Sequence, residues 1–299
     1  MRIIFSACQA AHAYMIGNNY SVGLRTCCAD CKNTWAGWVK ICHCMNGGGA
    51  IGIERWRQKM SIPQDYVSVD LETTGLNPKI DKIIEIGMVI VRNGQVEQEY
   101  STLVNPYQQL RPETVELTGI RDEMLTDAPG ISRVIGKCLE LCGDLPLLGH
   151  KILFDYSFLK KAAVNEGMEF EKQGIDTLKL CRKFMPAVEK KNLSSACAYY
   201  GVDLTGAHRA SHDALATHKL YQRLTAAYGE AAEEDFLPKP LIYKIKREQP
   251  ATKRQKEVLR ELLKYHKISV TVQIDHLSRN EISRLTDRII LQYGRMLKR

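Results

Sequence analysis

The chain has 299 residues, of which 44% are hydrophobic and 25% charged, a composition typical of a folded globular protein. The sequence contains no run of about 18 apolar residues, so we expect no membrane-spanning helix. The net charge of +8 is concentrated at one end, because residues 238–299 hold 16 Lys and Arg against 6 Asp and Glu. This basic end indicates a polyanionic partner, although a charge run is equally consistent with a solvated face.

The ten cysteines fall into two groups. Six occur within the first 44 residues, and four of these form two close pairs that suggest a zinc site: Cys28, Cys31, Cys42 and Cys44. The one-residue spacing of the second pair departs from the usual zinc pattern. The other group lies in apolar helical patterns and indicates buried thiols of a reduced, cytoplasmic protein: Cys138, Cys142, Cys181 and Cys197.

Residues 1–59 read as an irregular, Cys-rich extension without sustained periodicity. The first 13 residues weakly resemble a secretory signal, but Ser, Cys and Gln interrupt their apolar stretch. Because Met60 immediately precedes the first strong strand signal, we expect it to be the initiator and residues 1–59 to be untranslated natively.

Strand signals then follow one another at 66–71, 83–92 and 96–104. Asn93-Gly94 separates the last two and predicts a tight hairpin. Helices and short strands alternate after this meander. Helices are expected at 112–117, 131–142, 155–166, 177–184, 193–200 and 211–228, and strands at 145–148 and 173–176. This order predicts an α/β fold, a ribonuclease H-like mixed sheet with flanking helices.

A linker is expected at 229–250, since this stretch is acidic, then proline-containing, then basic. Residues 251–299 predict a small basic helical module. Two capping boxes mark its helices: Thr252 with Gln255, and Ser278 with Glu281. The basic exterior is consistent with phosphate contacts, and equally with a protein-binding or structural appendage.

Asp70 and Glu72 place two carboxylates on one face of the first strand, because side chains two apart point the same way. Buried like charges repel unless a cation lies between them. Asp155 begins a later helix, and Asp213 begins the last helix before the linker. Four acids from three elements predict a site for hard cations, Mg²⁺ or Mn²⁺.

Three motifs carry a resemblance to the DEDDh family of 3′–5′ exonucleases: VDLETTG (69–75), GHKILFDYSFL (149–159) and HRASHD (208–213). The connecting stretch TVELTGIRDEMLTDAP (114–129) is similar to that of proofreading subunits and domains of bacterial DNA polymerase III, such as the epsilon subunit. The resemblance covers about residues 64–228.

The resemblance implies two-metal hydrolysis that releases 5′-mononucleotides from DNA 3′ ends, either in proofreading or in repair trimming. Asp70, Glu72, Asp155 and Asp213 would hold two Mg²⁺ or Mn²⁺ ions, and His208 would be the general base.

Four further residues are candidate substrate contacts. Thr73 is expected to meet the terminal 3′-hydroxyl, and Leu76 and Phe154 to contact terminal bases. For Phe154, a position in the hydrophobic core is an alternative to a contact with the substrate base. Lys151 stands where the family usually has Asn and is expected to face the substrate phosphates. His150 and His212 are interpreted as structural residues rather than ligands.

Two alternative functions remain open at this point: an exoribonuclease, and a nucleic-acid-binding protein without activity. The sequence shows no polymerase domain, so a proofreading role implies a replicative polymerase in trans.

Overall fold

The computed structural model describes five stretches of the chain: residues 32–34, 39–41, 61–204, 206 and 208–296. Met60 and the four candidate zinc ligands lie outside these residues. In the N-terminal unit, Met1–Met60, β1 (Lys32–Thr34) pairs antiparallel with β2 (Val39–Ile41).

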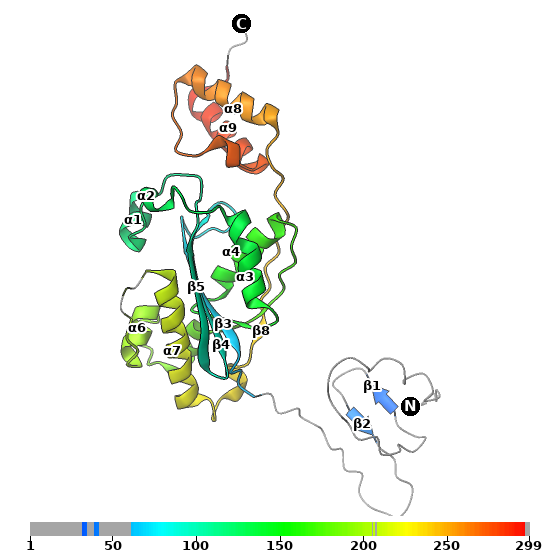
Figure 1. Cartoon of the computed structure of the whole chain (residues 1–299), viewed down its shortest axis with the longest axis vertical. Helices are drawn as coiled ribbons and strands as arrows, with labels where there is room; N and C mark the ends of the chain where they lie inside the picture. Colours follow the sequence, from blue (N-terminus) through cyan, green and yellow to red (C-terminus); the bar gives the residue numbers. More distant parts are fainter. Residues whose placement is uncertain (1–31, 35–38, 42–60, 205, 207, 297–299) are drawn as a thin grey trace, which may run out of the picture. The chain divides into compact units, whose positions relative to one another are not determined.

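The second unit, Ser61–Arg299, is built on one mixed sheet in the order β5-β4-β3-β6-β7-β8 (Figure 1). The first three strands form an antiparallel meander, β6 and β7 run parallel to β3, and β8 is an antiparallel edge. Their bounds are β3 Tyr66–Thr73, β4 Ile83–Arg92, β5 Gln95–Leu103, β6 Leu147–Gly149, β7 Gln173–Asp176 and β8 Lys239–Pro240. Both residues of the Asn93-Gly94 turn have positive φ, as a tight hairpin requires. The predicted α/β, ribonuclease H-like architecture is confirmed.

Alternation along β3 directs its residues to two different cores. Val67, Val69 and Leu71 pack with α3 (Ile131–Cys142) and α4 (Leu153–Asn165). The residues between them therefore face the opposite layer. Figure 1 shows α3 and α4 on one side of the sheet and α6 and α7 on the other. That second layer comprises α5 (Thr177–Phe184), α6 (Leu193–Tyr199) and α7 (Ala210–Tyr228).

Smaller elements complete the unit. Two short helices, α1 (Pro112–Thr118) and α2 (Asp122–Leu125), cover a separate small core. Part of the expected linker belongs to the fold, because it contains the 3₁₀ turn η1 (Glu233–Asp235) and strand β8. The four later cysteines are buried free thiols, as predicted. In the part of the chain that the structure describes, no helix has the length and apolarity needed to cross a membrane.

The C-terminal module has a core of its own, formed by α8 (Lys253–His266), the 3₁₀ turn η2 (Ile274–His276) and α9 (Arg279–Tyr293). Both predicted capping boxes are present. Thr252 and Gln255 exchange hydrogen bonds at the start of α8, and Ser278 and Glu281 do so at the start of α9.

Candidate active site

The predicted metal ligands of β3 and α7 meet the predicted general base at one place. A carboxylate oxygen of Glu72, one of Asp213 and a ring nitrogen of His208 all lie within 4.8 Å of one another. Glu72 and Asp213 are buried, whereas His208 is exposed on the segment that precedes α7. Side chains distant in the sequence therefore face one shared space.

Asp70 and Asp155 bring two more carboxylates to this cluster. Asp70 precedes Glu72 by two residues on β3, so both side chains leave the same face of the sheet. Asp155 is buried in the first turn of α4. The negative charges of Asp155, Asp213 and Glu72 all act on Asp70. Asp70 and Asp155 therefore lie near the group whose ligand atoms are within 4.8 Å of one another, which among the described residues comprises Glu72, His208 and Asp213.

Helix α7 approaches the sheet closely because β4 carries a glycine beneath it. Gly87 lies opposite Asp70 in the β3–β4 register. A Cβ at Gly87 would lie 2.1 Å from the carbonyl carbon of Ala210, so any side chain there would displace the helix. On β3, the Ser68 hydroxyl donates to the Ala214 carbonyl at 2.7 Å. These contacts bring the first turn of α7 to the carboxylates.

Asp213 has one oxygen hydrogen-bonded and one without a partner. Its Oδ2 accepts a hydrogen bond of 3.0 Å from the backbone N–H of His208, a residue in the left-handed region at φ +66°. Its Oδ1 is buried and has no hydrogen-bond partner among the described residues. Such an oxygen is costly to bury, and a bound cation would satisfy it.

Burial and crowding raise the pKa of these carboxyls. Burial is the main cause for Asp70, Asp155 and Asp213, and neighbouring carboxylates add to it. Burial, followed by the charge of Asp213, raises the pKa of Glu72 to about 8. Hard divalent cations would favour the ionised forms, and carboxylate oxygens are the ligands that Mg²⁺ and Mn²⁺ prefer. The donor set therefore fits a divalent metal.

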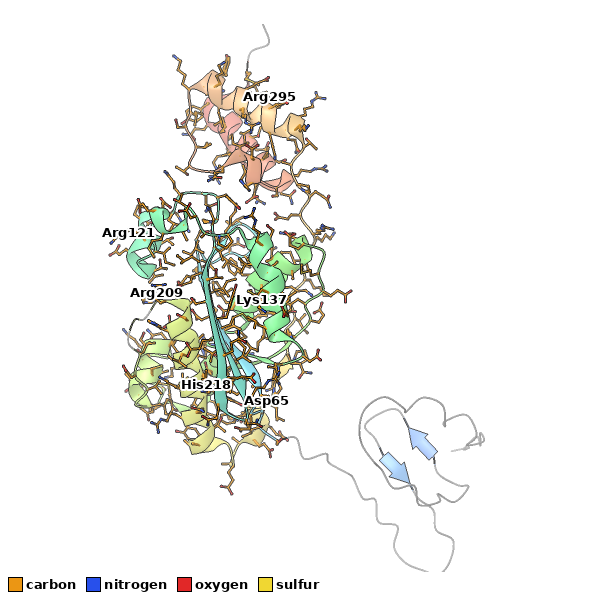
Figure 2. The ribbon with its side chains drawn as sticks, viewed as in Figure 1. Asp65, Arg121, Lys137, Arg209, His218 and Arg295 are labelled. Atoms are coloured by element: carbon orange, nitrogen blue, oxygen red, sulfur yellow. The ribbon has the colours of Figure 1, made fainter. Side chains whose placement is uncertain are left out.

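Glu85 of β4 is a further buried carboxylate beside the cluster, and the sequence interpretation missed it. It lies opposite Glu72 in the sheet register and is 0% exposed. Its oxygens accept hydrogen bonds from Arg209 Nη2 at 2.8 Å and Nε at 3.1 Å, and from the Ala210 backbone N–H at 3.0 Å. Figure 2 shows Arg209 at the start of α7. We infer that Glu85 positions the start of this helix and is not itself a ligand.

A Glu85→Gln substitution should lower turnover by about 10-fold to 100-fold, because misplacing a catalytic group by about 1 Å costs on the order of 10²-fold. We expect kcat to fall more than KM rises, since the residue acts on the helix that carries Asp213. The measurement is steady-state hydrolysis of single-stranded DNA. The matched control is Glu140→Gln, which removes an exposed carboxylate paired with Lys137 on α3. Equal kinetics in the two variants would contradict a positioning role.

The predicted substrate residues differ in their exposure and in their contacts. The Thr73 hydroxyl donates to the Gly75 carbonyl at 2.7 Å, and Leu76 is 83% exposed. Lys151 is exposed, and its ammonium lies 5.8 Å from the ring centroid of Phe154. Phe154 itself is half-buried against the α3–α4 core, which agrees with the core-aromatic reading. Thr73, Leu76 and Lys151 remain predicted contacts.

His150 and His212 are occupied by structural contacts. The ring nitrogens of His150 lie 3.0 Å from the Thr177 hydroxyl and 2.7 Å from the Lys191 carbonyl. Burial lowers the pKa of His150, which disfavours its charged form. Nδ1 of His212 lies 3.1 Å from the Gly206 carbonyl. Neither residue belongs to the group formed by Glu72, His208 and Asp213.

Comparison with known proteins gives relatives for this part of the chain. The chain is 37% identical over 162 residues to the PolC-type DNA polymerase III of Bacillus cereus and 38% identical over 164 residues to that of Bacillus subtilis. Each match covers 54% of this chain and 11% of the relative. The chain therefore spans about a ninth of the length of these polymerases.

The fold has a solved counterpart in E. coli exonuclease I in complex with a dT13 oligonucleotide. The two share a TM-score of 0.50 at 16% identity, and the match covers 57% of this chain and 43% of that one. The RNase_T family, described as an exonuclease family, matches residues 67–221, which include all the clustered carboxylates and His208. The chain belongs to the RNase_T exonuclease family.

Proposed function

We propose that this chain is a metal-dependent 3′–5′ exonuclease that releases 5′-mononucleotides from DNA 3′ ends. The observation that carries the proposal is the meeting of Glu72, Asp213 and His208 within 4.8 Å, beside Asp70 and Asp155. The family match and the polymerase III relatives support a nuclease role.

Asp70, Glu72, Asp155 and Asp213 are the proposed ligands of two Mg²⁺ or Mn²⁺ ions. Bound ions would lower the pKa of the attacking water and stabilise charge on the reacting phosphate. The partnerless Oδ1 of Asp213 and the raised pKa values of the four carboxyls support this assignment.

His208 is the proposed general base. Its ring nitrogen lies beside two proposed ligands, while the residue remains exposed, so it can take the proton of the attacking water and pass it to solvent. Its backbone N–H donates to Asp213, which links the segment that carries the base to the metal site.

The 3′ end of the substrate is placed by residues around the cluster. The hydroxyl oxygen of Thr73 is free to accept a hydrogen bond from the terminal 3′-hydroxyl, because its own proton is donated to Gly75. Leu76 projects into solvent directly after β3 and would contact the terminal base. Phe154 offers the exposed part of its ring, and Lys151 offers a cation to the phosphates.

We place the exonuclease domain at 64–228, followed by the connecting segment 229–250 and the basic module 251–299. The RNase_T match at 67–221 and the separate core of α8 and α9 support this division, with β8 of the connecting segment adding an edge strand to the exonuclease sheet. Since the matched relatives are PolC-type DNA polymerases III, we propose that the exonuclease acts together with a cytoplasmic replicative polymerase if the role is proofreading.

End-labelled single strands test direction and sugar preference together. With DNA labelled at the 5′ end and Mg²⁺ present, we expect a ladder of progressively shorter products. With the label in the 3′-terminal nucleotide, we expect immediate release of a labelled 5′-mononucleotide. The Asp155→Asn protein and EDTA are the controls that should abolish both signals. Preferential digestion of the matched RNA would identify an exoribonuclease, and no digestion of either strand would contradict the proposal.

A further inference from the structure

Backbone hydrogen bonds attach the C-terminal module to the exonuclease domain 64–228, the body of the molecule. The N–H of Gln109 donates to the Thr271 carbonyl, and the N–H of Gln273 donates to the Tyr107 carbonyl, both at 2.8 Å. The Tyr107 ring stacks on His276 with centroids 3.5 Å apart and planes within 6° of parallel. This is the geometry of a docked element.

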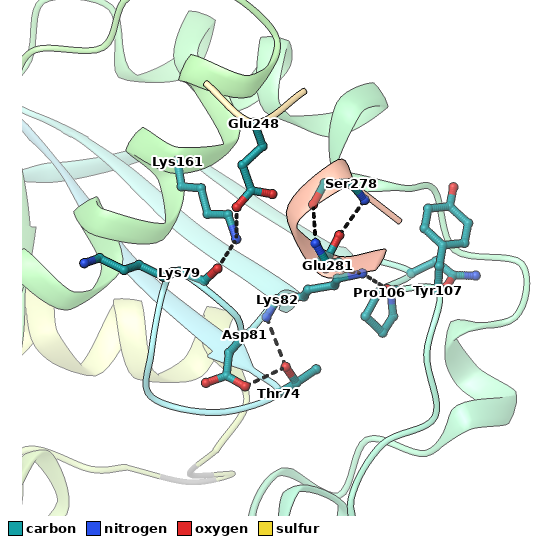
Figure 3. Close-up of polar contacts among 11 residues, drawn as sticks. Thr74, Lys79, Asp81, Lys82, Pro106, Tyr107, Lys161, Glu248, Ser278 and Glu281 are labelled. Carbon is teal, nitrogen blue, oxygen red and sulfur yellow. Dashed lines mark hydrogen bonds and ion pairs between the residues drawn. The ribbon is translucent and has the colours of Figure 1, made fainter. Parts of the chain in front are cut away.

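Two lysines of the body form ion pairs with glutamates of the C-terminal segment (Figure 3). Lys82 Nζ lies 3.4 Å from Glu281 at the start of α9 and donates to the Pro106 carbonyl at 3.1 Å. Lys161 Nζ lies 4.0 Å from Glu248, in the segment before α8, and donates to the Lys79 carbonyl at 3.3 Å. Each lysine therefore joins the C-terminal segment to the body.

Glu281 is fixed and ionised at this contact. Its carboxylate completes the capping box with Ser278, and its side chain is only 19% exposed, as is that of Lys82. Burial alone would raise the pKa of Glu281, but the charge of Lys82 and the hydrogen bonds of Ser278 lower it below its ordinary value. The ion pair is thus partly shielded from solvent, where it is screened less than a surface pair.

The contacts of both lysines converge on the loop 74–82, which begins two residues after Glu72. Its ends are tied together, because the Thr74 N–H donates to the Lys82 carbonyl at 2.8 Å and the Lys82 N–H donates to the Thr74 hydroxyl at 3.0 Å. Leu76 projects from this loop, and the loop lies next to the carboxylate cluster along β3. Lys79 and Lys82 are two of the points at which it is held, and Arg111 holds it at Thr74 and Asp81.

We propose that the C-terminal module and the segment before it position the loop 74–82 at the 3′ end of the substrate. The module acts through the Glu281–Lys82 pair and the segment through the Glu248–Lys161 pair. The inference rests on the proposed function and adds a role for the module in it. Glu281 and Lys82 are positioning residues. They set the placement of Leu76 and of the backbone after Glu72.

Glu281→Gln is the decisive variant, because Gln preserves the capping box while removing the charge that faces Lys82. We expect KM for single-stranded DNA to rise by about fivefold with kcat little changed. Removing a negative charge should by itself tighten binding to a polyanion, so a raised KM is opposite to the simple electrostatic effect. The control is Glu257→Gln, which removes an exposed carboxylate from α8 and should leave KM unchanged or lower it.

A double-mutant cycle tests whether the two residues act through their contact. Lys82→Met should raise KM at least as much as Glu281→Gln, and the double variant should add little to Lys82→Met alone. Additive effects would contradict coupling through this ion pair.

Hydrogen–deuterium exchange of the metal-free protein, measured without substrate, separates this inference from the proposed function. Faster exchange within 74–82 in Glu281→Gln than in Glu257→Gln supports positioning, even if the wild-type protein digests no strand. Equal exchange in this loop for Glu281→Gln and Glu257→Gln overturns the inference.

Discussion

Turnover by the His208→Ala protein should fall by roughly 10²–10⁴, the usual contribution of a general base. The residue is exposed, so its loss should leave the fold intact. The four carboxylates should still bind metal, because the described residues show no hydrogen bond from the imidazole to any of them, and the backbone N–H that donates to Asp213 remains. Single-turnover digestion of DNA measures the loss, and the rise in melting temperature on adding Mg²⁺ measures the retained metal binding.

His212→Ala is the matched control for this experiment. It removes an imidazole four residues away whose Nδ1 contacts only the Gly206 carbonyl among the described residues, outside the metal-ligand group. We expect its turnover to stay close to that of the wild type. An equal loss in both variants would remove His208 from the proposed mechanism and point to a general disturbance of the segment before α7.

The site was predictable from the sequence because local rules place its members. The period of two along β3 puts Asp70 and Glu72 on one face, and Val67, Val69 and Leu71 on the other. Asp155 and Asp213 begin helices that follow clear strand or turn signals. Apolar periodicity predicted the strand Ile83–Arg92 and the helix Ile131–Cys142 at their observed limits.

Long-range pairing was not predictable in the same way. Glu85 stands alone in an apolar strand, and nothing in its neighbourhood identifies Arg209, 124 residues later, as its partner. Strand β8 contains Pro240, which sequence rules place at an edge or outside a sheet, and only its pairing with β7 shows that the expected linker enters the sheet there. The contact between α9 and Lys82 was not predictable either, since capping boxes predict where a helix begins but not what it contacts.

The metal-free protein should lose stability as the pH rises from about 4.5 to about 8 because of Glu72. The pKa of this carboxyl is raised from 4.5 in its ordinary state to about 8 in the fold, chiefly by burial. Between these values the folded state binds a proton that the unfolded state has released, so the contribution is fully present at low pH and is lost as the pH rises. The raised pKa values of Asp70 and Asp155 act in the same direction.

The measurement is the free energy of unfolding in urea, with EDTA present, across this pH range. The difference in this free energy between wild type and Glu72→Gln isolates the effect of Glu72 from that of other titrating groups. The Gln variant should gain stability relative to the wild type as the pH rises, while Glu140→Gln, whose carboxylate is exposed, should show no such trend. Adding Mg²⁺ at pH 8 should reverse the order, because metal binds the folded wild type more tightly than the variant that lacks a ligand. Parallel pH profiles for wild type and Glu72→Gln would show that the fold does not raise the pKa of Glu72. Glu72→Gln should therefore raise stability in EDTA and lower it in Mg²⁺. This reversal is expected only if the carboxylates destabilise the metal-free fold and are stabilised by a bound cation.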